Sequence, residues 1–125
     1  MKILFYWQDA EQQRESLIHG IRRELPDLGP EIQSTIEELE WNLKKPKEDD
    51  QVIVLAVHDQ RGLRELVSMR ELFQNIPLIL LTPDYKKETM KLAHQLRPRF
   101  LGNVEGDLES VIDVLKRIVE RRSEG

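Results

Sequence analysis

The sequence predicts an α/β fold in which a parallel sheet of five strands lies between two layers of helices. Two segments, Gln51 to Val57 and Ile76 to Leu81, are short and apolar and show no alternation of polar and apolar residues. Such segments are typical of strands that are covered on both faces, as in parallel sheets. Segments with strand character also alternate with segments of helical period along the whole chain, and right-handed crossovers join such units into a parallel sheet.

The N-terminal half contributes two predicted strand and helix pairs. Lys2 to Trp7 is short, apolar and aromatic, which is typical of a strand. A helix over residues 10–25 follows it, and Pro26 ends this helix. Glu31 to Ser34 is a short second strand. The helical period of these segments is carried by Leu17, Ile18, Ile21 and Leu25 in the first helix, and by Ile36, Leu39 and Leu43 in the second.

Local signals then mark where the remaining elements begin and end. Thr35 and Glu38 have the spacing of a capping box, which predicts the start of the second helix. The polar segment Lys44 to Asp50 is a loop before the third strand. A third helix runs from Leu63 through Phe73, and Thr82-Pro83-Asp84 opens a fourth. The fourth helix carries Met90, Ala93 and Leu96 and ends at Arg97-Pro98, Phe100-Leu101 is the fifth strand, and Asp107 starts a last helix with Leu108, Val111, Ile112, Leu115, Ile118 and Val119 on its stripe.

Composition excludes several classes of protein. Lys and Arg number 19 against 23 Asp and Glu among the 125 residues, so the net charge is −4, whereas a generic nucleic-acid binder has a basic stripe and a high pI. The apolar runs are far shorter than the roughly 20 residues that cross a bilayer, and no signal-type segment opens the chain. The absence of cysteine excludes disulfides and thiolate chemistry. We therefore expect a cytoplasmic protein of one domain, residues 1–125, that binds neither membrane nor nucleic acid.

Phosphate-binding motifs are absent as well. No GxGxxG or GxxxxGK[ST] occurs, which argues against a dinucleotide or P-loop site. The segment after the first strand is acidic and lacks the hydroxyl- and glycine-rich character of a flavin phosphate loop. No serine follows a strand in a position to form a hydrolase triad with His58 or His94.

The chain from Ile76 onward, IPLILLTPDYKKETMKLAHQLRPRFLGNVEGDLESVIDVLKRIV, resembles the part of a response regulator receiver domain that runs from strand 4 to helix 5. By the order and length of its elements, the resemblance covers essentially the whole sequence. It implies a flavodoxin-like, doubly wound (βα)5 fold with the strand order 2-1-3-4-5. It also implies a role in two-component signalling.

Receiver domains accept a phosphoryl group on an Asp at the end of strand 3, with Mg²⁺ held by acidic residues after strand 1. A Thr or Ser after strand 4 and a Lys after strand 5 complete the site. The resemblance places Ala56 or Val57 at the acceptor position, and neither residue can be phosphorylated. Asp59 lies two or three residues further on, about 6 to 10 Å along an extended chain. The degenerate receiver pocket that we expect consists of Gln8, Asp9, Ala56, Val57, Asp59, Thr82 and Asn103.

A pocket of this kind lacks the groups that phosphotransfer needs. Gln8 and Asp9 leave one carboxylate where two are expected, and a lone Asp9 should bind Mg²⁺ weakly. Asn103 replaces the lysine. We therefore expect a signalling module that acts through protein contacts, without phosphoryl donor, metal, cofactor or enzymatic activity. The alternative is a small-ligand or enzymatic site at the carboxyl edge of the sheet, built from Asp9, His58, Asp59, Thr82 and Asn103.

Several of these residues also have a purely structural interpretation. Asp9, Asp59 and Thr82 each precede a predicted helix, where they would cap its N-terminus. His58 would be a hydrogen-bonded loop residue. Trp7 would fill the space of the lost acidic pocket, or close a small-ligand site.

The resemblance also implies an interaction surface, because helix 4, strand 5 and helix 5 form the usual dimer and partner face of receiver domains. Here Lys87, Lys91 and His94 follow one another at i, i+4 and i+7, and Asp113 and Lys116 lie outside the apolar stripe of the last helix. A mixed-charge surface suits a modest protein contact, a homodimer or a partner complex. Trp41 lies off the apolar stripe of its helix, so it either packs on the Lys44 to Asp50 loop or anchors a partner.

Overall fold

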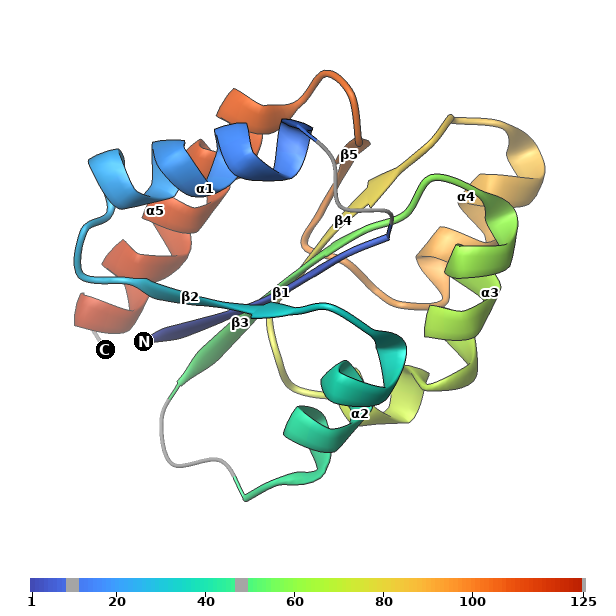
Figure 1. The fold of residues 1–125 in the computed structure, drawn as a ribbon, viewed down its shortest axis with the longest axis horizontal. Coiled ribbons are helices and arrows are strands. Elements are labelled where there is room, and N and C mark those ends of the chain that lie inside the picture. The colour runs from blue at the N-terminus through green and yellow to red at the C-terminus, as the bar shows by residue number, and fades with distance from the viewer. Residues whose placement is uncertain (9–11, 47–49, 125) are drawn as a thin grey trace.

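Five parallel strands form one sheet in the order β2-β1-β3-β4-β5, which confirms the predicted fold class and strand order (Figure 1). The computed structural model describes residues 1–8, 12–46 and 50–124 of the chain. The strands are β1 (Lys2–Trp7), β2 (Gly29–Gln33), β3 (Gln51–Ala56), β4 (Leu78–Thr82) and β5 (Phe100–Asn103).

Helices cover both faces of the sheet. The connecting elements are α1 (Gln12–Glu24), α2 (Ile36–Lys44), α3 (Gln60–Ser68), the 3-10 helix η1 (Arg70–Phe73), α4 (Lys87–His94) and α5 (Leu108–Glu124). Helices α1 and α5 lie together on one face, and α2, α3 and α4 lie on the other (Figure 1). Among the described residues, no helix has the length and apolar character that crossing a membrane requires.

The central strands are apolar throughout because their alternate side chains enter two different cores. In β3, Val52, Val54 and Ala56 pack with α1 and α5. Ile53 and Leu55, followed by Val57, pack with α2, α3 and α4. All six side chains are completely buried. The doubly covered strand that the sequence predicts is therefore confirmed.

The structure corrects the predicted start of the fourth helix. Thr82 is the last residue of β4 rather than a helix cap, and α4 begins at Lys87. The Asp84 carboxylate accepts a hydrogen bond from the Lys86 backbone N–H at 2.9 Å, which forms a turn between strand and helix. The sequence pattern Thr-Pro-Asp fits a helix cap and this turn equally well, because both use a short polar side chain to satisfy a backbone donor.

Other predicted boundaries are wrong by a few residues. The third helix divides at Met69 into α3 and η1, because Met69 leaves helical geometry with φ −111° and ψ 22°. The second strand begins at Gly29 and includes Pro30, which the ladder tolerates because β2 is an edge strand with a single neighbour. The fourth helix ends at His94, ahead of Arg97-Pro98, and the predicted start of the first helix at residue 10 lies outside the described residues.

Capping signals located the starts of α2 and α3 correctly. The Thr35 hydroxyl accepts from the Glu38 backbone N–H at 3.1 Å, and the Glu38 carboxylate accepts from the Ser34 backbone N–H at 2.9 Å. The capping box is therefore present, although Glu38 accepts from Ser34, the residue before the N-cap, and not from Thr35 itself. Asp59 is the N-cap of α3, as its position before that helix predicts.

Candidate functional site

The carboxyl ends of four strands bring the predicted pocket residues to one edge of the sheet. The register pairs Trp7 with Ala56, Ala56 with Leu81, and Thr82 with Asn103. Gln8 continues β1, and its backbone N–H donates to the Ala56 carbonyl at 2.9 Å. The described members of the predicted pocket thus lie at adjacent strand ends, where doubly wound sheets place their sites. Asp9 lies outside the described residues.

The position that the resemblance assigns to the phosphoryl acceptor is inside the core. Ala56 is completely buried, between Trp7 of β1 and Leu81 of β4, and all three belong to the core beneath α1 and α5. Val57 is also completely buried but faces the opposite core. Neither side chain carries a nucleophile, and both are withdrawn from solvent.

The Gln8 side chain joins the end of β1 to the loop after β3. Its carbonyl oxygen Oε1 accepts from the backbone N–H of His58 at 2.7 Å, and its amide Nε2 donates to Oδ1 of Asp59 at 3.2 Å. A Cβ atom at Gly62 would lie 2.5 Å from Gln8 Oε1, so the glycine leaves the space that the amide occupies. We call this arrangement of Gln8, His58, Asp59 and Gly62 the Gln8 bridge.

Oδ1 of the Asp59 carboxylate takes part both in the Gln8 bridge and in the N-cap of α3. Its Oδ1 accepts from the Gly62 backbone N–H at 2.8 Å. Two hydrogen bonds hold the pKa of the Asp59 carboxyl below its usual range, because both favour the charged form. The bond from the Gly62 backbone N–H has the larger effect, and the bond from the Gln8 side chain has the smaller one. Asp59 is thus an exposed N-cap whose ionised form is favoured, and both of these hydrogen bonds are on Oδ1.

Thr82 and Asn103 likewise direct their polar atoms at their own chain. The Thr82 side chain is completely buried, and its hydroxyl donates to the Asp84 carbonyl at 2.9 Å. Asn103 Oδ1 accepts from the Glu105 backbone N–H at 2.8 Å. These bonds shape the loops after β4 and β5 and leave the Thr82 hydroxyl without a free proton for a ligand.

Asp107 ties the loop after β4 to the loop after β5, a contact that the sequence did not predict. Its Oδ2 accepts from the Asn103 backbone N–H at 2.6 Å and from the Tyr85 hydroxyl at 3.0 Å. Partial desolvation and then the hydrogen bond and negative charge of Asp107 raise the pKa of Tyr85, because each disfavours the phenolate form. No local spacing signals this pairing, since 22 residues separate its members.

Two buried nitrogen atoms at this edge have no hydrogen-bond partner among the described residues. They are Nε1 of Trp7 and Nε2 of His58. Trp7 is 3% exposed, so its ring fills the core beside Ala56, in agreement with the space-filling role predicted for it. Within the described part of the chain, no group of three or more His, Asp or Glu side chains is arranged to hold a metal ion.

The predicted interaction residues separate in the structure. Lys87, Lys91 and His94 are all exposed, and they lie opposite Thr89 and Ala93, the buried side chains of α4. We call these three residues the α4 basic face. Asp113 of α5 is exposed as well.

Lys116, another predicted surface residue, is paired with Glu24 of α1 and keeps part of its side chain exposed. Its Nζ lies 3.1 Å from Glu24 Oε2, so the side chain points toward α1. The Lys116 ammonium, through its hydrogen bond and its charge, lowers the pKa of Glu24. Periodicity showed that Lys116 lies off the apolar stripe of α5, but it does not say which neighbouring element the side chain meets.

Trp41 is 66% exposed, and the Lys45 Nζ lies 5.5 Å from the centre of its ring. The prediction that it lies off the apolar stripe of its helix is confirmed. A cation over the ring face is a weak favourable contact at an exposed site. The structure therefore leaves a large aromatic surface on α2 available to a partner.

Comparison with known proteins identifies the fold. No protein-family model matches the sequence, and no curated protein matches it. Among solved structures, the chain is similar to a response regulator protein from Burkholderia pseudomallei whose crystal structure has a phosphorylated aspartic acid, a calcium ion and citrate. The TM-score is 0.67 at 16% sequence identity, and the match covers 99% of this chain and 72% of that one.

The structure thus defines a doubly wound, flavodoxin-like α/β protein. More narrowly, its fold is that of a response regulator receiver domain. The predicted resemblance is confirmed at the level of the fold.

Proposed function

We propose that the protein is a receiver-like signalling module that acts through contacts with other proteins and without phosphotransfer. One observation carries the proposal: Ala56 and Val57, the two residues that the resemblance assigns to the acceptor position, are both completely buried and apolar, Ala56 between Trp7 and Leu81. In this proposal the receiver fold is present while the acceptor position holds an apolar side chain. The hydrogen bonds of Asp59, Thr82 and Asn103 to their own chain support the same conclusion.

The contact surface that we propose is the α4 basic face beside the edge strand β5. Lys87, Lys91 and His94 present two ammonium groups and one imidazole to solvent. Such exposed charges contribute about 0 to 1 kcal/mol each and mainly set orientation and association rate. The proposed contact, with a second copy of the chain or another protein, is therefore modest in strength and sensitive to salt.

Charge reversal tests this surface. The double variant Lys87→Glu/Lys91→Glu is compared with the wild type by sedimentation at several concentrations and salt levels. The control is Arg22→Glu/Arg23→Glu, which reverses two exposed charges on α1 at the opposite face of the sheet. We expect self-association that high salt weakens, that the α4 variant abolishes and that the α1 control retains. Association that survives the α4 variant but is lost in Trp41→Ala would place the contact on α2 and contradict the proposal.

A second candidate function has one observation in its favour. His58 Nε2 and Trp7 Nε1 are buried without partners among the described residues, and such atoms are the kind that a small ligand satisfies. A ligand at 100 times its Kd adds about 2.7 kcal/mol to stability, which a thermal-shift screen detects. A reproducible shift that His58→Asn abolishes would favour this ligand site over the module proposed above.

A further inference from the structure

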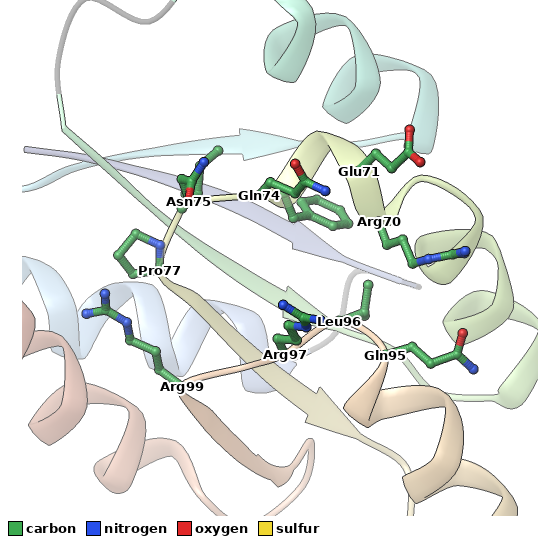
Figure 2. A pocket seen from close by; sticks show the side chains of 11 residues that line it. Arg70, Glu71, Gln74, Asn75, Pro77, Gln95, Leu96, Arg97 and Arg99 are labelled. Carbon is green, nitrogen blue, oxygen red and sulfur yellow. The ribbon is translucent and has the colours of Figure 1, made fainter.

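A cavity of about 760 Å³ lies at the opposite end of the sheet from the predicted pocket. Its lining comes from η1 and the connection that leads into β4, up to residue 77, and from the connection between α4 and β5, which contributes Gln95, Leu96, Arg97 and Arg99 (Figure 2). We call it the amino-edge cavity. Its volume is within the range of roughly 300 to 1,000 Å³ that small-molecule sites occupy.

Positive charge concentrates around this cavity. Three arginines, Arg70, Arg97 and Arg99, line it, and Glu71 is the acidic residue among its lining. Three positive charges and one negative charge leave a local excess of two, in a chain whose net charge is −4. Figure 2 shows Arg70 and Arg99 toward opposite ends of the cavity, with Arg97 between them.

Two of these guanidinium groups are available to a ligand. Arg97 and Arg99 are exposed, and no described residue forms a hydrogen bond or an ion pair with either guanidinium. Arg70 donates from Nη1 to the Val67 carbonyl at 3.2 Å, which fixes its side chain against the end of α3. The cavity therefore combines one anchored arginine with two whose guanidinium groups have no partner among the described residues.

The rest of the lining suits a ligand with both polar and apolar parts. Phe73, Ile76 and Leu96 are buried side chains of the core and form the apolar part of the wall. Gln74, Asn75 and Gln95 add amide groups that can both donate and accept hydrogen bonds. Small-molecule sites have this composition, an apolar wall with a few polar groups that fix orientation.

The backbone around the cavity is set by bonds and by two unusual turns. The Arg99 backbone N–H donates to the Leu78 carbonyl at 2.8 Å, so the two connections are joined directly. Asn75 has φ 66° and Arg97 has φ 51°, and these are the non-glycine residues with positive φ in the described chain. Asn adopts this left-handed conformation readily, but arginine rarely does, because its Cβ crowds the following carbonyl. The bend at Arg97 carries its side chain to the middle of the cavity in Figure 2.

We propose that the amino-edge cavity binds a small organic anion that carries two or more phosphate or carboxylate groups. A guanidinium fork pairs with two oxygen atoms of either group at once, and its charge is permanent. Arginines at both ends and in the middle of the cavity match an anion with charge along its length. The site is independent of the proposed module function, because none of its residues belongs to the carboxyl edge or to the α4 basic face.

Titration with three probes tests the proposal and separates the two kinds of anion. Pyrophosphate, ATP and citrate are each added to the isotope-labelled protein, and affinity is read from amide shifts. The test variant is Arg97→Gln/Arg99→Gln. The matched control is Arg61→Gln/Arg64→Gln, which removes two charges from α3, outside the cavity lining.

We expect at least one probe to bind, to shift amides of residues 70–77 and 95–99, and to bind at least tenfold more weakly to the test variant. The control variant should retain the wild-type affinity. Tighter binding of pyrophosphate and ATP than of citrate assigns a phosphate ligand, and the reverse order assigns a carboxylate. The proposal would be overturned if no probe binds at millimolar concentration. It would also be overturned if the test variant, with an amide spectrum that shows the wild-type fold, binds the probes with the wild-type affinity.

Discussion

The proposed absence of phosphotransfer depends most on Ala56. Its neighbours across the sheet are Trp7 and Leu81, and its side chain is completely buried. Ala56→Asp would restore the residue type of a phosphoryl acceptor. In this environment, however, the new carboxylate is buried without a partner, and its ionised form is strongly disfavoured.

We therefore expect Ala56→Asp to lower the free energy of unfolding by on the order of 3 kcal/mol at pH 7. Burial raises the pKa of a carboxyl above its unfolded value, so the folded state holds the proton more tightly. Stability therefore falls as pH rises from the unfolded pKa to the folded pKa. The loss should thus be smaller at pH 4 than at pH 7 in urea unfolding. Ala56→Asn is the uncharged control, and equal stability of the two variants at pH 7 would mean that the position opens to water.

Asp59 provides a second test at the scale of a single residue. As N-cap of α3 it accepts from the Gly62 backbone N–H, and removal of a cap costs about 1 kcal/mol. Its pKa is lowered in the folded state, chiefly by that bond. The stabilisation is therefore present above the unfolded pKa, about 3.9 for Asp, and is lost as pH falls through the lower folded value.

Asp59→Ala should accordingly be less stable than wild type at pH 6 and should approach it at pH 2. Asp59→Asn keeps a capping oxygen without a titrating charge, so its difference from wild type isolates the charge. Urea unfolding across this pH range measures both differences. A wild-type advantage that stays constant with pH would show that the carboxylate charge contributes nothing to the cap.

Elements are joined at the carboxyl edge by the Gln8 bridge, which links β1 to the start of α3. A methyl group at Gly62 would lie 2.5 Å from Gln8 Oε1 and would displace the amide from the His58 backbone N–H. We expect Gly62→Ala to cost about 1 kcal/mol, the net value of a hydrogen bond that is lost.

A double-mutant cycle tests whether that cost acts through the bridge. In the Gln8→Ala background the clash is absent and alanine is the better helix former, so Gly62→Ala should there be neutral or stabilising. Unfolding free energies of the four proteins give the coupling. Additive effects would mean that the glycine serves another purpose.

The sequence predicted elements best where burial is two-sided or where a cap is unambiguous. Strand β3 has no polar face, and Thr35 and Glu38 satisfy neighbouring donors, so both were located nearly to the residue. The start of α4 was missed because Thr82-Pro83-Asp84 serves a turn and a cap equally well. The pairing of Lys116 with Glu24 was not predicted, because periodicity fixes the angle around a helix but not the identity of the neighbour.

Sites assembled from distant segments were not predictable in the same way. Arg97 and Arg99 follow the end of a helix, where basic residues are common, and Arg70 lies more than 20 residues earlier. Only the sheet order brings the connections before β4 and β5 side by side, and so creates the amino-edge cavity. The Tyr85 to Asp107 contact depends on the same arrangement of neighbouring strands.

In the whole molecule, the described residues form the fold of a receiver domain, with a TM-score of 0.67 to a response regulator in a match that covers 99% of this chain. At the carboxyl edge, Thr82 and Asn103 bond within the chain, whereas Asp59 and Tyr85 are exposed. Other exposed residues lie on α2, on α4 and at the amino edge, and we expect the proposed contacts to use surfaces of this kind.

The most direct measurement of this central claim is the intact mass of the protein after incubation with acetyl phosphate and Mg²⁺, with a phosphorylatable receiver domain treated in parallel as the positive control. We expect an unchanged mass for this chain, because Ala56 and Val57 provide no acceptor and Asp59 is held in the cap of α3. An added phosphoryl group that hydroxylamine removes, which is the signature of an acyl phosphate, would contradict it.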